Sequence, residues 1–149
     1  MSAEGGCFCG AVRYRLDADP IFVNACHCRD CQKLGGSAFA LNAMVEADLV
    51  TVTRGEAATH AGEARCNACQ TLFWAEHPIF GAAIRFVRLG TLDEGECFPP
   101  DAHFFVRRRH PWVTIPDDLP RFETLPGEND PPLFNAEQQA RVDAAMARG

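Results

Sequence analysis

The stretch Cys26-His-Cys-Arg-Asp-Cys31 carries three thiols, here called the central triplet, in one short segment. The N-terminal pair, Cys7-Phe-Cys9, precedes it, and the second pair, Cys66-Asn-Ala-Cys69, follows it. Of the eight cysteines, only Cys97 lies outside these groups. Such short spacings let one turn of backbone present several sulfurs to a single ion, and a structural zinc takes four ligands in a tetrahedron. The cysteine pattern therefore predicts zinc sites that pin together strand ends and turns.

The seven clustered thiols divide into one site of four ligands and one of three. Three protein ligands leave a coordination position open, and an open position distinguishes a catalytic zinc from a structural one. One grouping joins the N-terminal pair with the second pair and leaves the central triplet as a local three-thiolate site. The other joins Cys28 and Cys31 with the second pair and scatters Cys26 and the N-terminal pair over two segments. We prefer the first grouping because it keeps each cluster whole, although spacing alone leaves both open.

The composition limits the partners that we expect. The chain has 149 residues, enough for one domain with a buried core, and a formal net charge of −6, which disfavours nucleic acid because phosphate binding needs a basic face. No apolar run approaches the roughly 18 residues of a membrane helix, and the N-terminus lacks the pattern of a signal peptide. We therefore expect a cytoplasmic protein without a membrane partner, whose reduced cysteines bind metal rather than form disulfides. The sequence leaves the oligomeric state open.

Short apolar or alternating segments separated by turns predict a mainly β fold. We expect strands over residues 11–16, 21–25, 38–45, 49–53, 72–74, 81–89, 103–106 and 112–115. A Pro- and Gly-rich stretch at 126–132 indicates a linker, and Asn135 with Gln138 forms a capping-box pattern before an Ala-rich segment. We therefore expect a zinc-binding domain over 1–125, and a linker with a short C-terminal helix over 126–149. A helix of this length either docks on the domain or a partner, or it frays.

Several motifs are specific enough to indicate a family. They are Gly6-Cys-Phe-Cys-Gly-Ala-Val-Arg-Tyr14, the central triplet with Gln32-Lys33 and Gly36-Ser-Ala-Phe39, the second pair, Gly90-Thr-Leu-Asp93, His103, and Pro111-Trp112. Together they resemble the glutathione-dependent formaldehyde-activating enzyme family, which is also described as centromere-protein-V-like. The resemblance covers roughly residues 5–123, nearly the whole predicted domain.

The resemblance carries expectations about fold and activity. It implies a β-tent, in which small twisted antiparallel sheets are pinned by zinc. It implies a carbon–sulfur lyase that combines glutathione and formaldehyde into S-(hydroxymethyl)glutathione, with two zinc ions per chain and glutathione or another thiol as co-substrate. The implied ligands are Cys7, Cys9, Cys66 and Cys69 for a structural zinc and Cys26, Cys28 and Cys31 for the catalytic zinc.

The residues around the second pair depart from the family pattern. The family usually has an aromatic residue before this pair and a glycine after it, whereas Arg65 and Gln70 stand there in this chain. Glycine after such a pair commonly supplies a positive φ, so we expect Gln70 to reshape the turn. Neither departure removes a ligand, but both bear on the local surface and on whether the family's named substrate fits.

Other residues near the clusters have less specific patterns. We expect His27, which stands between two ligands, to be packed or hydrogen-bonded rather than a catalytic base. Arg29 and Lys33 lie beside the central triplet and suit either a substrate carboxylate or a solvated surface. The lone thiol of Cys97 is expected to be buried, although as a fourth ligand it would close the open position. Trp112 is expected in the core.

Two classes of function fit these observations. In the first, a substrate thiol becomes a thiolate at the open zinc position and adds to the carbonyl carbon of an aldehyde. In the second, the protein is a non-catalytic zinc scaffold or protein-binding module of the same fold. A less favoured third class is a redox protein in which a disulfide within the central triplet releases zinc. Metal content and turnover of a Cys31→Ser variant would separate the first two classes.

Overall fold

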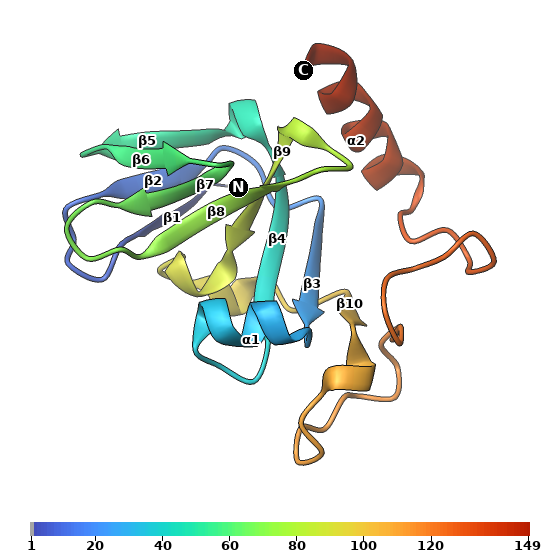
Figure 1. Cartoon of the computed structure of the whole chain (residues 1–149). Helices are drawn as coiled ribbons and strands as arrows, with labels where there is room; N and C mark the ends of the chain where they lie inside the picture. Colours follow the sequence, from blue (N-terminus) through green and yellow to red (C-terminus); the bar gives the residue numbers. More distant parts are fainter. Residues whose placement is uncertain (1) are drawn as a thin grey trace.

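The computed structural model describes residues 2–149, and its strands form two sheets (Figure 1). The smaller sheet has the order β1 (Ala3–Gly6), β2 (Arg13–Leu16), β5 (Val50–Arg54). The larger sheet has the order β10 (Ala102–Phe104), β3 (Phe22–Cys26), β4 (Ala40–Glu46), β9 (Gly81–Arg88), β8 (Leu72–His77), β7 (Glu63–Cys66), β6 (Ala57–His60). Neighbouring strands are antiparallel except for β10, which pairs in parallel with β3.

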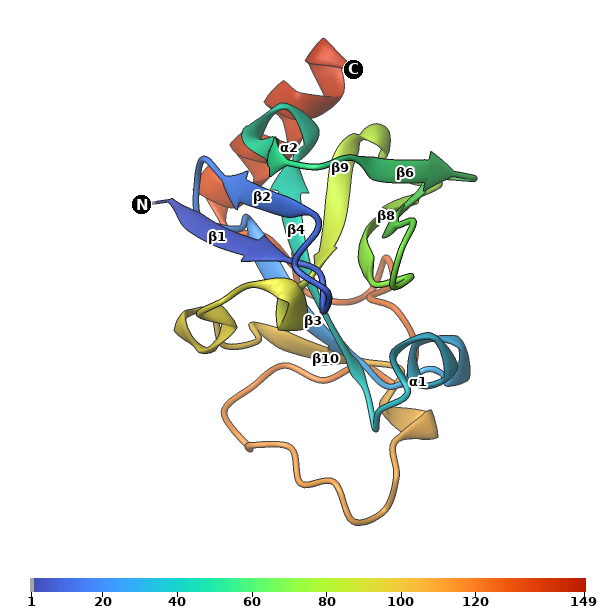
Figure 2. The ribbon, with the colours of Figure 1, turned by 90° about the vertical axis from the view of Figure 1, so that its left-hand side faces the viewer.

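Two α-helices accompany the sheets, α1 (Arg29–Gly35) and α2 (Ala136–Arg148). The two helices lie at opposite ends of the molecule, and both views show this separation (Figures 1 and 2). The mainly β fold with a C-terminal helix is therefore confirmed. No helix among residues 2–149 is long and apolar enough to cross a membrane.

The tract around residues 112–115 is not a strand, so this prediction is wrong. Proline lacks a backbone N–H and disfavours a central strand, and Pro111 and Pro116 bracket the tract. The Val113 N–H instead bonds to the His110 carbonyl at 3.0 Å and closes a turn. The Trp112 side chain is 72% exposed rather than in the core, and it stacks on His110 with ring centroids 5.0 Å apart.

The core between the two sheets is built around Tyr14. The alternation in β2 turns Tyr14 and Leu16 inward, and neither is exposed to solvent. The Tyr14 ring meets Phe73 and Trp74 edge-on, at centroid distances of 5.9 and 5.6 Å. Its hydroxyl is 2.5 Å from the Thr91 hydroxyl, so the one polar atom of the ring is hydrogen-bonded. The small sheet is thus fixed on the large one by aromatic packing.

The opposite face of the large sheet is covered at one end by α2. Val142 and Ala145 of α2 are buried in a second apolar cluster with Phe22, Met44 and Ile84. The predicted capping box is present at the start of this helix. The Gln138 backbone N–H donates to the Asn135 side chain at 2.8 Å, and the Asn135 backbone N–H donates to the Gln138 side chain at 2.9 Å. The helix therefore docks on the domain rather than fraying.

We expect Arg141→Ala in α2 to lower the free energy of unfolding by about 3 kcal/mol, because it leaves a buried carboxylate unpaired. Arg141 donates to both carboxylate oxygens of Glu46 at 2.7 Å, and only 5% of the Glu46 side chain is exposed. The matched control is Arg148→Ala, since the Arg148–Asp48 pair is more than half exposed and should cost under about 1 kcal/mol. Urea unfolding of both variants measures the difference, and equal losses would contradict this account.

Candidate metal centres and the adjoining pocket

The N-terminal pair and the second pair form one four-thiol cluster. Their four Sγ atoms all lie within 4.8 Å of one another. Cys7 Sγ is 3.6 Å from Cys9 Sγ, and Cys9 Sγ is 3.8 Å from Cys66 Sγ. Four sulfurs at about 2.3 Å from a tetrahedral zinc are roughly 3.8 Å apart, so the spacing fits zinc and is far too long for a disulfide.

The turn after β1 presents Cys7 and Cys9, and the end of β7 with the turn that follows it presents Cys66 and Cys69. The N-terminal pair follows β1 in a tight turn, in which Gly10 N–H bonds to the Cys7 carbonyl at 3.1 Å and Gly10 adopts a φ of +80°. The Val12 N–H donates to Cys7 Sγ at 3.3 Å. Such bonds stabilise the thiolate form that a metal ligand requires.

The turn after the second pair keeps a positive φ although it lacks glycine. Gln70 adopts a φ of +64°, and its N–H bonds to the Cys66 carbonyl at 2.9 Å. The expectation that Gln70 reshapes the turn is therefore wrong: the backbone holds the left-handed conformation despite its cost to a residue with a Cβ. Arg65 also holds this turn, since its Nη1 donates to the Gln70 carbonyl at 3.3 Å.

The central triplet forms a separate three-thiol cluster at the junction of β3 and α1. Cys26 is the last residue of β3, Cys28 is the N-cap of α1, and Cys31 lies in the first turn of the helix. Their Sγ atoms lie within 4.8 Å of one another, and Cys28 Sγ accepts the Cys31 N–H at 3.3 Å. The structure thus groups the cysteines as four plus three. Cys97 belongs to neither group and is exposed, so its expected burial is wrong.

Charges around the central triplet favour a thiolate at Cys31. The Cys26 thiol hydrogen-bonds to Cys31, which lowers the pKa of Cys31 and raises that of Cys26. The guanidinium of Arg88 lowers the pKa of Cys31 further. The start of α1 adds the positive end of a helix dipole, although α1 has only two turns. The triplet therefore has a positive surrounding suited to thiolates that hold a cation.

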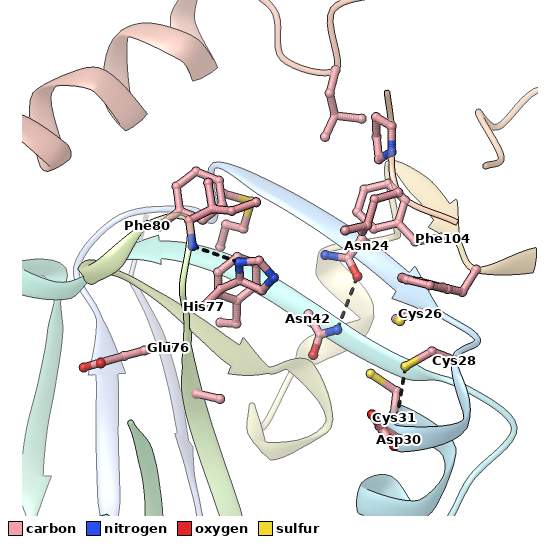
Figure 3. A pocket seen from close by; sticks show the side chains of 18 of the residues that line it. Asn24, Cys26, Cys28, Asp30, Cys31, Asn42, Glu76, His77, Phe80 and Phe104 are labelled. Carbon is pink, nitrogen blue, oxygen red and sulfur yellow. Dashed lines mark hydrogen bonds between the residues drawn. The ribbon is translucent and has the colours of Figure 1, made fainter. Parts of the chain in front are cut away.

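The central triplet opens onto a pocket of about 550 Å³ on the face of the large sheet that α2 partly covers. Figure 3 shows the sulfurs and Asp30 at one end, Phe80 at the other, and Asn24 with Asn42 between them. Phe104, on β10, pairs with Cys26 of β3. The other apolar residues that line it are Met44, Ala75, Ile79, Phe86, Phe105, Leu125, Pro126, Leu133 and Phe134. The four-thiol cluster contributes no residue to this lining.

A row of polar side chains crosses the pocket floor and was missed from the sequence. Asn24, Asn42 and Arg88 stand opposite one another on β3, β4 and β9. Asn42 Nδ2 donates to Asn24 Oδ1 at 3.2 Å, and the Arg88 guanidinium donates to Asn42 Oδ1. An asparagine inside an otherwise apolar strand is a sequence pattern that could have indicated Asn24 and Asn42. The register that aligns them with Arg88 is visible only in the folded sheet.

His27 is packed and hydrogen-bonded, as predicted. Its side chain is fully buried, and its Nε2 lies 2.9 Å from Nδ1 of His103. Burial, and then the proximity of His103, lowers the pKa of His27 to about 4, so both rings are neutral near pH 7. Gln32 holds the adjoining backbone, because its amide donates to the carbonyls of His27 and Arg108 at 2.7 and 3.0 Å. These contacts fix α1 and its sulfurs against β10.

Arg29 and Lys33 do not face the pocket of the central triplet. They line a second surface pocket with Gln32, His110 and Trp112. Arg29 also donates to the Gln32 side chain at 2.8 Å. Of these two readings, the structure thus favours a solvated surface over direct contact with a substrate beside the three sulfurs. The arginine that lines the larger pocket together with the three sulfurs is Arg88.

Comparisons with known proteins show the family of this chain. Residues 2–108 match the profile of the family described as "Glutathione-dependent formaldehyde-activating enzyme", well over half of the chain. The chain belongs to this family. A Halomonas elongata protein named "Putative glutathione-dependent formaldehyde-activating enzyme" is 30% identical over 129 residues, covering 77% of this chain and 82% of that protein. The crystal structure of a Rhodobacter sphaeroides protein is 18% identical with a TM-score of 0.45, covering 61% of this chain and 88% of that chain.

The family match contains both thiol clusters but not the whole pocket. All seven clustered cysteines and Arg88 lie within residues 2–108. Leu125, Pro126, Leu133 and Phe134 line the pocket from beyond the matched region. Both candidate metal centres therefore lie within the region that the family profile matches, whereas the segment before α2 supplies one apolar wall of the cavity.

We expect Gln70→Gly to raise the free energy of unfolding by about 1 kcal/mol, because glycine adopts a positive φ without the strain of a Cβ. The matched control is Gln139→Gly at the fourth residue of α2, which should lower the free energy of unfolding by about 1 kcal/mol because glycine is a poor helix former. Each substitution removes one exposed side-chain hydrogen bond, so that loss cancels in the comparison. Urea unfolding of zinc-loaded protein measures both, and a loss of stability in Gln70→Gly would contradict the strain argument.

Proposed function

We propose that this protein catalyses the addition of a thiol to an aldehyde, the carbon–sulfur lyase chemistry that the family name implies. The family pair is glutathione and formaldehyde, whose product is S-(hydroxymethyl)glutathione. The observation that carries the proposal is the contrast between the clusters. Four sulfurs complete one tetrahedral site, whereas the three sulfurs of the central triplet open onto a pocket of about 550 Å³.

Each cluster has its own part in this proposal. Cys7, Cys9, Cys66 and Cys69 hold a structural zinc that ties the turn after β1 to the end of β7. Cys26, Cys28 and Cys31 hold the catalytic zinc, for two zinc ions per chain. When bound to three thiolates, zinc supplies an open Lewis-acidic position at which a substrate thiol is deprotonated. Reduced thiols are needed at both sites, so we also propose that the protein works in the cytoplasm.

The polar row beside the central triplet supplies the rest of the chemistry. Three thiolates and one divalent cation sum to a charge of −1, which Arg88 offsets, and Asp30 is a further anionic side chain at the same end of the pocket. Arg88 is held in place because it donates to Asn42, which itself donates to Asn24. A guanidinium has five N–H donors, so Arg88 retains donors for the carbonyl oxygen of an aldehyde. In the overall reaction, the sulfur bonds to the carbonyl carbon and the thiol proton ends on the carbonyl oxygen.

We expect Cys31→Ser to bind about one zinc per chain instead of about two, to stay folded, and to lose turnover. The measurements are metal content by atomic emission and the rate of adduct formation above the spontaneous rate, followed by exchange NMR. The control is Cys66→Ser, which removes a buried member of the four-thiol cluster and should unfold at a lower temperature. If Cys31→Ser unfolds, or keeps full turnover, the non-catalytic zinc scaffold is the better account.

We expect Arg88→Gln to keep about two zinc ions per chain and to lower the catalysed rate by about 10- to 100-fold, the usual cost of losing an outer-sphere partner. The matched control is Arg85→Gln on the same strand. Arg85 faces the other side of the sheet, with its guanidinium 4.8 Å from the Trp74 ring centre, and it does not line the pocket. Equal rates in the two variants would rule out a role for Arg88 in the reaction.

A further inference from the structure

The pocket beside the central triplet is more apolar than formaldehyde or glutathione requires. Its end remote from the sulfurs holds Phe80 (Figure 3), whose ring centroid lies 5.8 Å from that of Phe86, and the lining also includes Phe104, Leu133 and Phe134. Formaldehyde has no substituent that would occupy this end. The cavity of about 550 Å³ lies within the range of about 300–1,000 Å³ that is typical for drug-sized ligands. A ligand that is larger than formaldehyde and more apolar than glutathione fits this cavity better.

The charges of the lining argue against the glutathione backbone as the occupant. Glutathione has two carboxylates, whereas the lining has one arginine and two acidic residues, Asp30 and Glu76. The arginine is Arg88, which stands in the polar row next to the sulfurs and already donates to Asn42.

The aromatic end has no arginine or lysine. Its one basic side chain in the lining is His77, whose ring centroid lies 6.2 Å from that of Phe80 and 5.8 Å from that of Phe86. Desolvating the two carboxylates of glutathione at this end would be unfavourable. We therefore expect the peptide part of a glutathione co-substrate to lie in solvent rather than in this apolar end of the pocket.

The apolar wall is a fixed part of the fold. Phe134 immediately precedes the N-cap of α2, and its ring meets Phe22 edge-on with centroids 5.5 Å apart. Leu133 and Phe134 both pack on the cluster that α2 buries. This wall lies beyond residues 2–108, the region that the family profile matches. A docked C-terminal segment thus holds preformed apolar surface opposite the candidate reaction site.

We propose that this pocket selects aldehydes with an aromatic or branched aliphatic substituent. The substituent lies against the C-terminal wall, and the carbonyl carbon lies beside the central triplet. The inference rests on the proposed function, because it names the aldehyde for the same reaction. The thiol sulfur bonds to the carbonyl carbon, the carbonyl π pair moves to oxygen, and the thiol proton joins that oxygen. The product is a hemithioacetal, and no oxidant or reductant is needed.

The test uses the full zinc-loaded chain with glutathione and either phenylacetaldehyde or formaldehyde. The readout is the ratio of the two catalysed rate constants, each corrected for the spontaneous reaction. Burial of extra apolar groups changes such ratios by about tenfold or more, so Phe134→Ala should lower the ratio by about tenfold. Ile79→Ala should lower it less, and it keeps the fold because Ile79 is 64% exposed. The control Met146→Ala, on the exposed side of α2, should leave the ratio unchanged.

A binding measurement separates the pocket from the reaction. Calorimetric titration with 2-phenylethanol, which has the same phenyl group but no carbonyl, should show binding to wild type and to Met146→Ala. The affinity should fall at least about fivefold in Phe134→Ala. Two results would overturn the proposed selection of aldehydes. One is an unchanged rate ratio in both Phe134→Ala and Ile79→Ala, and the other is no binding of 2-phenylethanol. If formaldehyde is still turned over in either case, the proposed function stands. Turnover of neither aldehyde would overturn both.

Discussion

The main electrostatic constraint on this molecule is the placement of three sulfurs within 4.8 Å of one another at the end of β3. As thiolates they repel one another, so the site needs a cation among them and positive groups around them. The surrounding structure meets this demand. The start of α1 points at the sulfurs, Arg88 approaches Cys31 from β9, and Gln32 fixes the backbone of the loop. The buried pair of His27 and His103 stays neutral and adds no further charge.

The face of the large sheet is divided between two helices. Near one end, α2 buries Phe22, Met44 and Ile84, and near the other, α1 holds the sulfurs. The pocket is the part of the face that neither helix covers, and its floor follows from the period of two in β3, β4 and β9. Asn24 and Cys26 share one face of β3 for this reason. The position of α2 therefore decides how much of the sheet remains open to a ligand.

The sequence predicted the parts that depend on local spacing. Cysteines with one or two residues between them can bind one ion wherever the chain turns, so the two clusters could be predicted from the sequence. The capping box of α2 could be predicted for the same reason, because it also depends on local spacing. The polar row was not, because the alignment of Asn42 with Arg88 depends on the register between β4 and β9. Trp112 and Cys97 were misplaced because an apolar or thiol side chain carries no information about whether its loop packs on the core. Gln70 shows that a turn held by its neighbours keeps its conformation without glycine.

The two metal centres differ in their surroundings more than in their sulfurs. Four thiolates with zinc would carry a charge of −2, and solvent reaches Cys7, Cys9 and Cys69 of the four-thiol cluster, so it can stabilise that charge. Three thiolates with zinc would carry −1, which Arg88 offsets, and this lowers the cost of placing such a centre beside an apolar cavity. In the proposed reaction, a substrate thiolate that enters there would restore an unfavourable negative charge. That charge would be lost when the thiol proton joins the carbonyl oxygen, because the hemithioacetal is neutral.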